Sequence, residues 1–205
     1  MSNPIIDAIE RRRTTVLFDP SRDIDDEQIR ELVRHATRAP TFFNLQNWRF
    51  IAVRTPEAKA RLRQVAWDQA KITEAAVTFI ICGQLADHRV MADRLHPAVA
   101  AGIMPEPMVP GWEAAAKSLY FEQPQRQRDE AIRTATFGAA TLIFAAHAMG
   151  LGAGPMIGFD AEAVAREFDL APDEVPAMLV AVGYATPENW PQKPRRRLDQ
   201  VLRLV

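Results

Sequence analysis

The sequence predicts an α+β fold built as a single domain of 205 residues. Helical and strand-like segments follow one another without the regular strand–helix–strand alternation of parallel sheets, which favours α+β. Two apolar segments, residues 77–82 and 177–184, are typical of strands, and the first is apolar on both faces, as a central strand should be. Residues 134–159 carry no Asp, Glu, Lys or Arg, which indicates a buried helix followed by a loop. No linker or repeat divides the chain, so one domain over 1–205 is expected.

The composition is that of an ordinary globular protein. Hydrophobic residues make up 48%, charged residues 25%, and the formal net charge is −1. Such a balance argues against a nucleic-acid binder and against a membrane-surface protein. The charge-free segment contains His147 and breaks at Gly150, so we expect no membrane span there. Cys82 is the only cysteine, which fits a reducing compartment, and we expect the cytoplasm.

Three consecutive arginines end the first expected helix, in the sequence ERRRTTVLFD (residues 10–19). Asn3 and Pro4 are a plausible helix start. Arg12 continues the apolar stripe of that helix, and Arg13 flanks it. A cation directed inward is costly unless an anion meets it, so the pattern predicts either a protein carboxylate or a ligand phosphate beside Arg12. The residues of the stripe, expected to be buried, are Ile5, Ala8 and Ile9.

The remaining elements follow from capping signals and periodicity. Asp25 and Gln28 form a capping-box pattern before the second helix, and Thr55-Pro56 begins another. Residues 48–54 are expected to form a strand. Residues 86–125 are rich in proline and aromatic residues, and we expect short helices or a flap there. Two further helices are expected, at residues 126–149 and 160–168.

The glycine-rich stretch GLGAG (residues 150–154) resembles a dinucleotide fingerprint only faintly. That motif must follow a strand and open a helix, whereas here it follows a helix, so a Rossmann fold is rejected. Gly150 is expected to be a helix C-cap that leads into a turn. Free backbone N–H groups near Gly158 could face an acceptor atom on a ligand.

Taken together and in order, several segments resemble the FMN-dependent nitroreductases over nearly the whole chain. The block GPMIGFD with GYATP also resembles a branch that includes predicted malonic semialdehyde reductases. The segments that carry the family resemblance are ERRRTTVLFD, RAPTFFNLQNWRFIAV, GLGAGPMIGFD, VAVGYATP and KPRRRLDQVL.

The resemblance implies a set of FMN-binding residues from distant parts of the chain. The N-terminal segment and the tail would hold the FMN phosphate, a guanidinium binding it as a bidentate fork. A loop after the second helix would reach the flavin of the other subunit. The turn before residue 160 would lie beside the isoalloxazine, and a lysine, with Asp68 near it, would lie at the pyrimidine edge. These residues are, in that order, Arg12, Arg13 and Thr14 with Lys193 and Arg195; Pro40, Thr41, Asn44 and Gln46; Pro155, Met156, Ile157 and Gly158; and Lys71.

The resemblance also implies fold, partners and reaction. The fold would be a three-layer one with a mostly antiparallel central sheet, and the tail would extend onto a second copy in a homodimer. NAD(P)H would reduce FMN, and a nitroaromatic, quinone or conjugated carbonyl would then be reduced in the same place, which gives ping-pong kinetics. The cofactor supplies the chemistry, so no catalytic side chain and no metal is expected. Residues 86–125 would be a variable insertion that selects the substrate.

Other functions remain open from the sequence. One is a flavin enzyme of another reaction type, such as small semialdehyde reduction or reductive dehalogenation. Another is a flavin-binding store or sensor with little turnover. Three positions depart from the family pattern: Val16 replaces a common cation, Phe42 a small polar residue, and Ile157 a glutamate of some members. The physiological acceptor and the choice between NADH and NADPH are not determined.

Overall fold

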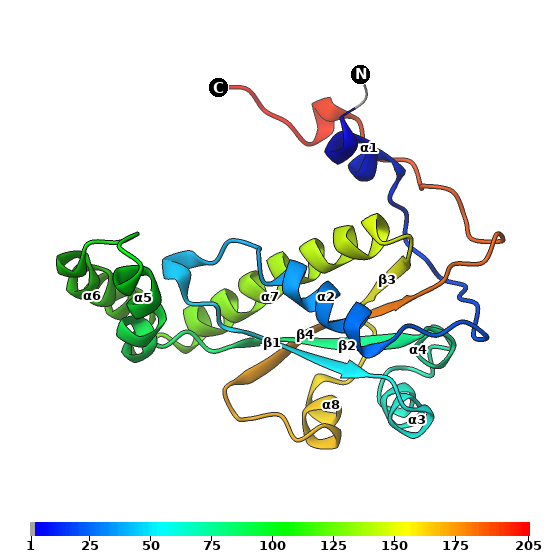
Figure 1. Cartoon of the computed structure of the whole chain (residues 1–205), viewed down its shortest axis with the longest axis horizontal. Coiled ribbons are helices and arrows are strands. Elements are labelled where there is room, and N and C mark those ends of the chain that lie inside the picture. Colours follow the sequence, from blue (N-terminus) through cyan, green and yellow to red (C-terminus); the bar gives the residue numbers. More distant parts are fainter. Residues whose placement is uncertain (1–2) are drawn as a thin grey trace.

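A four-stranded sheet forms the centre of the protein, seen in a computed structural model that describes residues 3–205 (Figure 1). The order across the sheet is β1-β2-β4-β3, and each neighbouring pair is antiparallel. This confirms the predicted α+β class with an antiparallel sheet. The strands are β1 (Trp48–Val53), β2 (Val77–Gln84), β3 (Gly152–Met156) and β4 (Glu174–Gly183).

The central position of β2 follows from its apolar sequence. Both of its faces are covered, and seven of its eight residues are buried. Ile80 pairs with Ile51 of β1 on one side and with Leu179 of β4 on the other. The expectation that this segment is a two-sided central strand is confirmed.

One face of the sheet is covered by α7 (Pro124–Ala148) and α2 (Asp26–Ala36) (Figure 1). Small residues on α7 allow it to approach the sheet closely, and a Cβ added to Gly83 of β2 would overlap the backbone of Ala131. The helical part of the charge-free segment, up to Ala148, thus buries one face as predicted, whereas Phe137 and Phe144 on another face are exposed in the single chain. No helix among the described residues is long and apolar enough to cross a membrane. The main buried residues of this layer are Leu32, Ala36, Phe79, Ile81, Ala135, Ala139, Leu142, Ala146, Val180 and Val182.

The opposite face is covered by α3 (Pro56–Gln64), α4 (Lys71–Glu74) and α8 (Ala161–Glu167). Thr55 caps α3 and Asp160 caps α8 through side-chain oxygens that accept backbone N–H bonds. The predicted helix starts at Thr55-Pro56 and near residue 160 are confirmed, whereas the short α4 was not predicted. The buried residues of this layer include Leu62, Ile72, Ile80, Cys82, Val164, Leu179 and Ala181.

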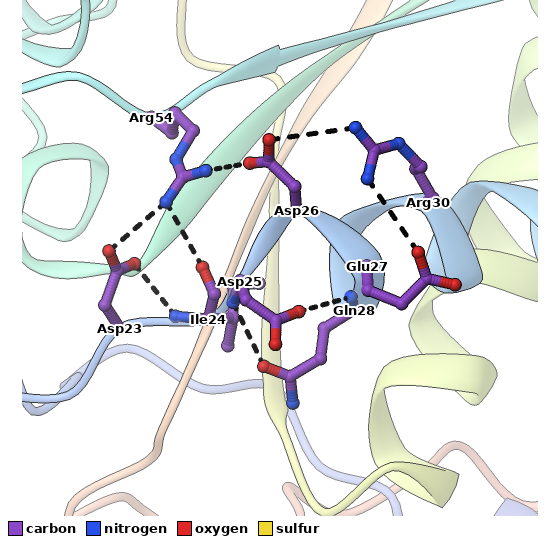
Figure 2. Close-up of polar contacts among 8 residues, drawn as sticks. All are labelled: Asp23, Ile24, Asp25, Asp26, Glu27, Gln28, Arg30 and Arg54. Atoms are coloured by element: carbon purple, nitrogen blue, oxygen red, sulfur yellow. Dashed lines mark hydrogen bonds and ion pairs between the residues drawn. The ribbon is translucent and has the colours of Figure 1, made fainter.

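The N-terminus of α2 is fixed by a set of polar contacts (Figure 2). Asp25 accepts the N–H of Gln28, and the Gln28 side chain accepts the N–H of Asp25, which is the predicted capping box. Arg54, directly after β1, donates to Asp26 and to Asp23. These contacts attach α2 to the sheet edge.

Residues 86–125 form a small helical subdomain at one end of the sheet (Figure 1). It contains α5 (Met91–Ala100) and α6 (Val109–Tyr120), and its own core includes Met91 and Leu95. A buried carboxylate ties it to α7, because Glu130 accepts hydrogen bonds from Tyr120, Thr134 and Arg133. The segment predicted as short helices or a flap is thus helical and packed. Short 3-10 turns occur at Phe42–Asn44, His88–Val90, Glu106–Met108 and Leu198–Gln200.

Two expectations were wrong within the single chain. The apolar stripe of α1 (Pro4–Arg11) is not buried: Ile5 is 71% exposed and Ile9 51%. The helix leaves the body of the molecule beside the tail, so its apolar face has no core to cover it (Figure 1). Residues 152–156, expected as a turn, instead form the edge strand β3, because pairing with β4 satisfies their backbone. Gly150, with φ of 74°, does cap α7 as predicted.

Candidate functional site

The site begins where the segment after α1 joins the edge of the sheet. Thr15 donates its backbone N–H to the carbonyl of Ala153 at 2.9 Å, and Thr14 forms a parallel bridge with Ala153. Gly152 and Gly154 leave no room for a side chain, since a Cβ on either would overlap Thr15. Glycines at these positions therefore let the segment lie directly against β3.

The C-terminal part of the chain joins the same segment from the other side. Asn189 accepts the backbone N–H groups of Val16 and Leu17 at 2.8 and 3.0 Å, and its amide donates to Leu17 O at 2.6 Å. Thr186 N donates to Leu17 O at 3.2 Å. Residues from the two ends of the chain thus form one wall.

Two neighbouring hollows adjoin this wall. The smaller, of about 110 Å³, brings together Thr14, Val16, Lys193 and Arg195. The larger, of about 650 Å³, lies between the end of α1, the end of α7 and the start of β3. Gln192 lines both hollows. The larger hollow is here called the arginine cleft, and its lining includes His147 and the charged residues Glu10, Arg11, Arg12, Arg13 and Arg22.

The cations of the arginine cleft have little compensation from the protein. Arg12 is the half-buried C-cap of α1, and its N–H donates to Ala8 O. None of the four arginines forms an ion pair with any residue that the structure describes. Arg22 instead lies over the ring of Tyr184, with 3.3 Å between its guanidinium carbon and the ring centroid. The arrangement is suited to bind an anion.

A second part of the site lies at the end of β3 and in the turn that follows it, at residues 155–158. Met156 is buried, whereas Ile157 is 82% exposed at the tip of the turn. Lys71, at the start of α4, extends its aliphatic chain to within 3.8 Å of the place where a Cβ of Gly154 would stand. Burial lowers the pKa of the Lys71 amine. Its side chain thus lies beside Gly154 of β3.

The turn 155–158 is held in place by the segment before α4. Gln69 donates from its side-chain amide to Gly158 O at 2.8 Å. The ring of Trp67 lies so close to Gly158 that a Cβ there would stand 2.7 Å from Trp67 Cε3. Trp67 and Asp68 both have left-handed backbones, and Asp68 accepts from Arg63 Nε at 2.6 Å. Such strain is stable only where surrounding contacts fix it.

The loop of Pro40, Thr41, Asn44 and Gln46 lies elsewhere in the chain. It sits between α2 and β1, beside the α5–α6 subdomain, and lines neither hollow. Gln46 N donates to Thr41 Oγ1, and the Gln46 amide donates to Asn44 Oδ1 at 3.3 Å. Phe43, Asn44 and Gln46 have φ near +50°, so the loop has an unusual, defined shape.

The structure therefore divides the predicted site residues into two groups. One group, from residues 12–14, 71, 155–158 and 193–195, lies along β3 and the wall that adjoins it. The loop 40–46 stands apart, and within one chain it does not meet them. Sequence reasoning missed Asn189, Tyr184 and Arg22; only the run PENWP, with its turn-forming residues, gave a signal near Asn189.

Two alternative kinds of chemistry lack the residues they need. The residues that the structure describes contain no group of three His, Cys, Asp or Glu side chains placed to hold a metal. Cys82 is buried in the sheet, and burial raises the pKa of its thiol to about 12, so it stays protonated at neutral pH. Neither a metal centre nor a thiol nucleophile is supported.

Comparison with known proteins identifies the family. The DrgA protein of Synechocystis is 36% identical over 189 residues, which cover 92% of this chain and 87% of DrgA. An NADH dehydrogenase of Thermus thermophilus is 29% identical over 202 residues, covering 97% and 96% of the two chains. A protein of Exiguobacterium sibiricum, crystallised in complex with FMN, has the same fold at 22% identity, with a TM-score of 0.90 over 100% and 99% of the chains. The family model of the nitroreductases matches residues 9–184. This chain therefore belongs to the nitroreductase family, a family of oxidoreductase enzymes.

Proposed function

We propose that the protein is an FMN-dependent NAD(P)H oxidoreductase that reduces nitroaromatics, quinones or related small acceptors. The observation that carries the proposal is the meeting of Thr14 with Lys193 and Arg195 around one small hollow. These residues come from opposite ends of the chain, and the resemblance to the family implies a phosphate-binding role for each of them. A phosphate is the anion that such a set of N–H, O–H and cationic groups binds best.

The residues present fit FMN at each part of the molecule. Lys193, Arg195 and Arg12 supply cations for the phosphate, and Thr14 supplies a hydroxyl. The edge strand β3 leads to the exposed turn at Ile157, which offers a flat ring an apolar edge. Lys71 has no hydrogen-bond acceptor among the described residues, which leaves its amine for the ring edge.

FMN, when bound, accepts a hydride from NAD(P)H and passes it to the acceptor. The chain's own residues bind and orient. Arg12, Arg195 and Lys193 fix the phosphate end, while Gln69 and Trp67 hold the turn 155–158 in a fixed position. A cation at Lys71 favours negative charge on the ring edge. Donor and acceptor use one place in turn, which predicts ping-pong kinetics.

A homodimer completes this proposal. An apolar groove of about 860 Å³ lies between α1 and α7, and it would be covered by a second copy. The exposed apolar residues of the tail, among them Leu202 and Leu204, would lie on that copy. The loop 40–46 would then reach the flavin of the other subunit. The groove is lined by Pro4, Ile5, Ala8, Ile9, His35, Arg38, Thr141, Phe144, Ala145, Ala148 and Met149.

Absorption spectroscopy of the purified protein tests the proposal. We expect a bound flavin spectrum that bleaches on anaerobic addition of NADPH or NADH and returns on addition of a nitroaromatic or quinone. A colourless protein that does not take up added FMN would contradict the proposal. Bound flavin that neither nicotinamide bleaches would favour a store or sensor. A panel of acceptors that includes a small semialdehyde then identifies the reaction type.

A further inference from the structure

We propose that the arginine cleft binds the 2′-phosphate of NADPH, with Arg22 as the principal ligand, so that the enzyme prefers NADPH to NADH. The inference rests on the proposed function, because it concerns the donor of that same site. It assigns a role to Arg22, Tyr184 and His147, which the binding of FMN leaves unused.

The geometry of Arg22 carries the inference. Its guanidinium lies over the ring of Tyr184, 3.3 Å from the ring centroid. A stacked guanidinium keeps all its N–H donors in its own plane, directed away from the ring, and this arrangement suits bidentate binding of a phosphate. The two carboxylates nearest to it in sequence have other donors. Asp23 accepts from Ile24 N at 2.8 Å and from Arg54 at 3.4 Å, and Asp19 accepts from the N–H and the hydroxyl of Ser21 at 3.0 and 2.6 Å. The Arg22 fork lines the cleft without a direct ion pair among the described residues; its nearby anion is Asp19, whose pKa is lowered first by the hydrogen bonds of Ser21 and less by the Arg22 charge.

Two of the other arginines, Arg11 and Arg12, have places that the end of α1 explains, whereas Arg22 does not. Arg11 is in the last turn of α1 and Arg12 caps it, where cations interact favourably with the helix dipole. Arg22 belongs to no helix and lies on the loop before α2. A stacked, unpaired arginine on a loop is more informative about a ligand than an arginine at a helix end.

The charge of the cleft exceeds what the FMN phosphate requires. Four arginines line it against a single carboxylate, Glu10, and Lys193 and Arg195 stand in the neighbouring hollow. One dianion held by Arg12, Lys193 and Arg195 leaves Arg11, Arg13 and Arg22 without a direct ion pair among the described residues. Like charges that converge in this way are unfavourable unless a further anion binds. His147, at the cleft wall, adds a donor for that anion.

The position of the cleft is suited to a nicotinamide donor. Its wall includes Gly152 and Ala153, the start of the strand that leads to the turn 155–158, and Gln192 joins it to the smaller hollow. Ile143 and Leu151 give the cleft an apolar floor, against which an adenosine can pack. The adenosine end of NADPH would thus lie beside the flavin phosphate and its nicotinamide towards the turn.

Anaerobic stopped-flow reduction of the flavin by NADPH and by NADH tests the inference in Arg22→Gln. We expect the Kd for NADPH to rise about 10-fold or more, because the 2′-phosphate loses one charged hydrogen-bonding partner. The Kd for NADH should be unchanged. Arg30→Gln is the matched control, an exposed arginine on α2 that pairs only with Asp26 and Glu27. It should change neither value. In the parent protein, 2′,5′-ADP should compete with NADPH more strongly than 5′-ADP does.

The outcomes separate this inference from the proposed function. If the Kd values for NADPH and NADH change equally in Arg22→Gln, or if neither changes, the assignment of Arg22 to the 2′-phosphate is overturned. Loss of FMN from Arg22→Gln would also overturn it, because the residue would then belong to the flavin site. Flavin that neither nucleotide reduces in the parent protein would contradict the proposed function instead. Inhibition by inorganic phosphate equal to that by 2′,5′-ADP would show a general anion site and overturn the assignment.

Discussion

The side-chain oxygen of Asn189 lies 2.8 Å from the backbone nitrogen of Val16 and accepts its hydrogen bond across 173 positions of sequence. The same side chain accepts from Leu17 N and donates to Leu17 O and Thr186 O. One residue thus holds the N-terminal segment and the tail in a fixed relation. Both the smaller hollow and the arginine cleft depend on that relation, since each is lined by residues of both segments.

Substitution Asn189→Ala should therefore loosen the site as well as the fold. We expect the free energy of unfolding to fall by roughly 1–3 kcal/mol, because the Val16 and Leu17 N–H groups lose their acceptor. The Kd for FMN should rise by about 10-fold. Urea unfolding and flavin titration of the apoprotein measure the two effects. Gln64→Ala, an exposed change at the end of α3, should alter neither, and an unchanged FMN affinity in Asn189→Ala would contradict the role of this contact.

Substitution Gly154→Ala should separate the N-terminal segment from the sheet. The added Cβ would overlap the carbonyl oxygen of Thr15, so the segment or β3 has to move. Overpacking of this kind costs about 1–3 kcal/mol. Gly111→Ala is the control, because nothing lies within 4 Å of the new atom and alanine favours the helix α6. Thermal unfolding should show a lower Tm for the first variant only; equal Tm values would refute the close approach.

Substitution Tyr120→Phe tests the attachment of the α5–α6 subdomain to α7. The Tyr120 hydroxyl donates to the buried carboxylate of Glu130 at 3.2 Å, and the variant leaves that acceptor one donor short. We expect a loss of about 1 kcal/mol in the free energy of unfolding. The other tyrosine provides the comparison, and Tyr184→Phe should leave the free energy of unfolding nearly unchanged. Local hydrogen exchange in α6 should rise in Tyr120→Phe alone.

Cys82 should make stability fall at high pH. Burial raises the pKa of its thiol from 9.0 to about 12, so the folded state holds the proton more tightly than the unfolded state. The stabilisation is complete below about pH 9 and is lost progressively as the pH rises towards about 12. Unfolding free energies at pH 7, 9 and 10 should decline more steeply for the parent than for Cys82→Ala. Parallel declines, or rapid thiol labelling of the native protein at pH 8, would contradict this burial.

Sequence reasoning was most successful where one local signal decided the structure. The capping box at Asp25 and Gln28, the apolar β2 and the charge-free half of α7 each follow from residue type and spacing. The prediction that the apolar face of α1 is buried within the chain was wrong, because amphipathic spacing indicates that a face is covered without indicating what covers it. The prediction of a turn at residues 152–156 was wrong. Glycine-rich sequence is typical of turns, whereas here the glycines lie in an edge strand and make room for Thr15 beside it.

The candidate site was predictable in part. The arginine run could be selected because a cation placed inward needs an anion, and family resemblance supplied the rest, including the basic tail. Asn189 and the stack of Arg22 on Tyr184 depend on contacts between residues more than 150 positions apart, which spacing along the chain does not encode. The separation of the loop 40–46 from the other residues likewise required the three-dimensional structure.

The central claim is that cations from the two ends of the chain jointly bind the flavin phosphate. Flavin retention by the double variant Arg12→Ala/Arg195→Ala, measured by absorbance after gel filtration, tests it most directly. Arg30→Ala/Arg196→Ala removes the same charge from exposed positions and serves as control. The account predicts that the first variant, with unchanged far-UV circular dichroism, loses most of its FMN while the control keeps it. Equal retention of FMN in both variants would contradict the account.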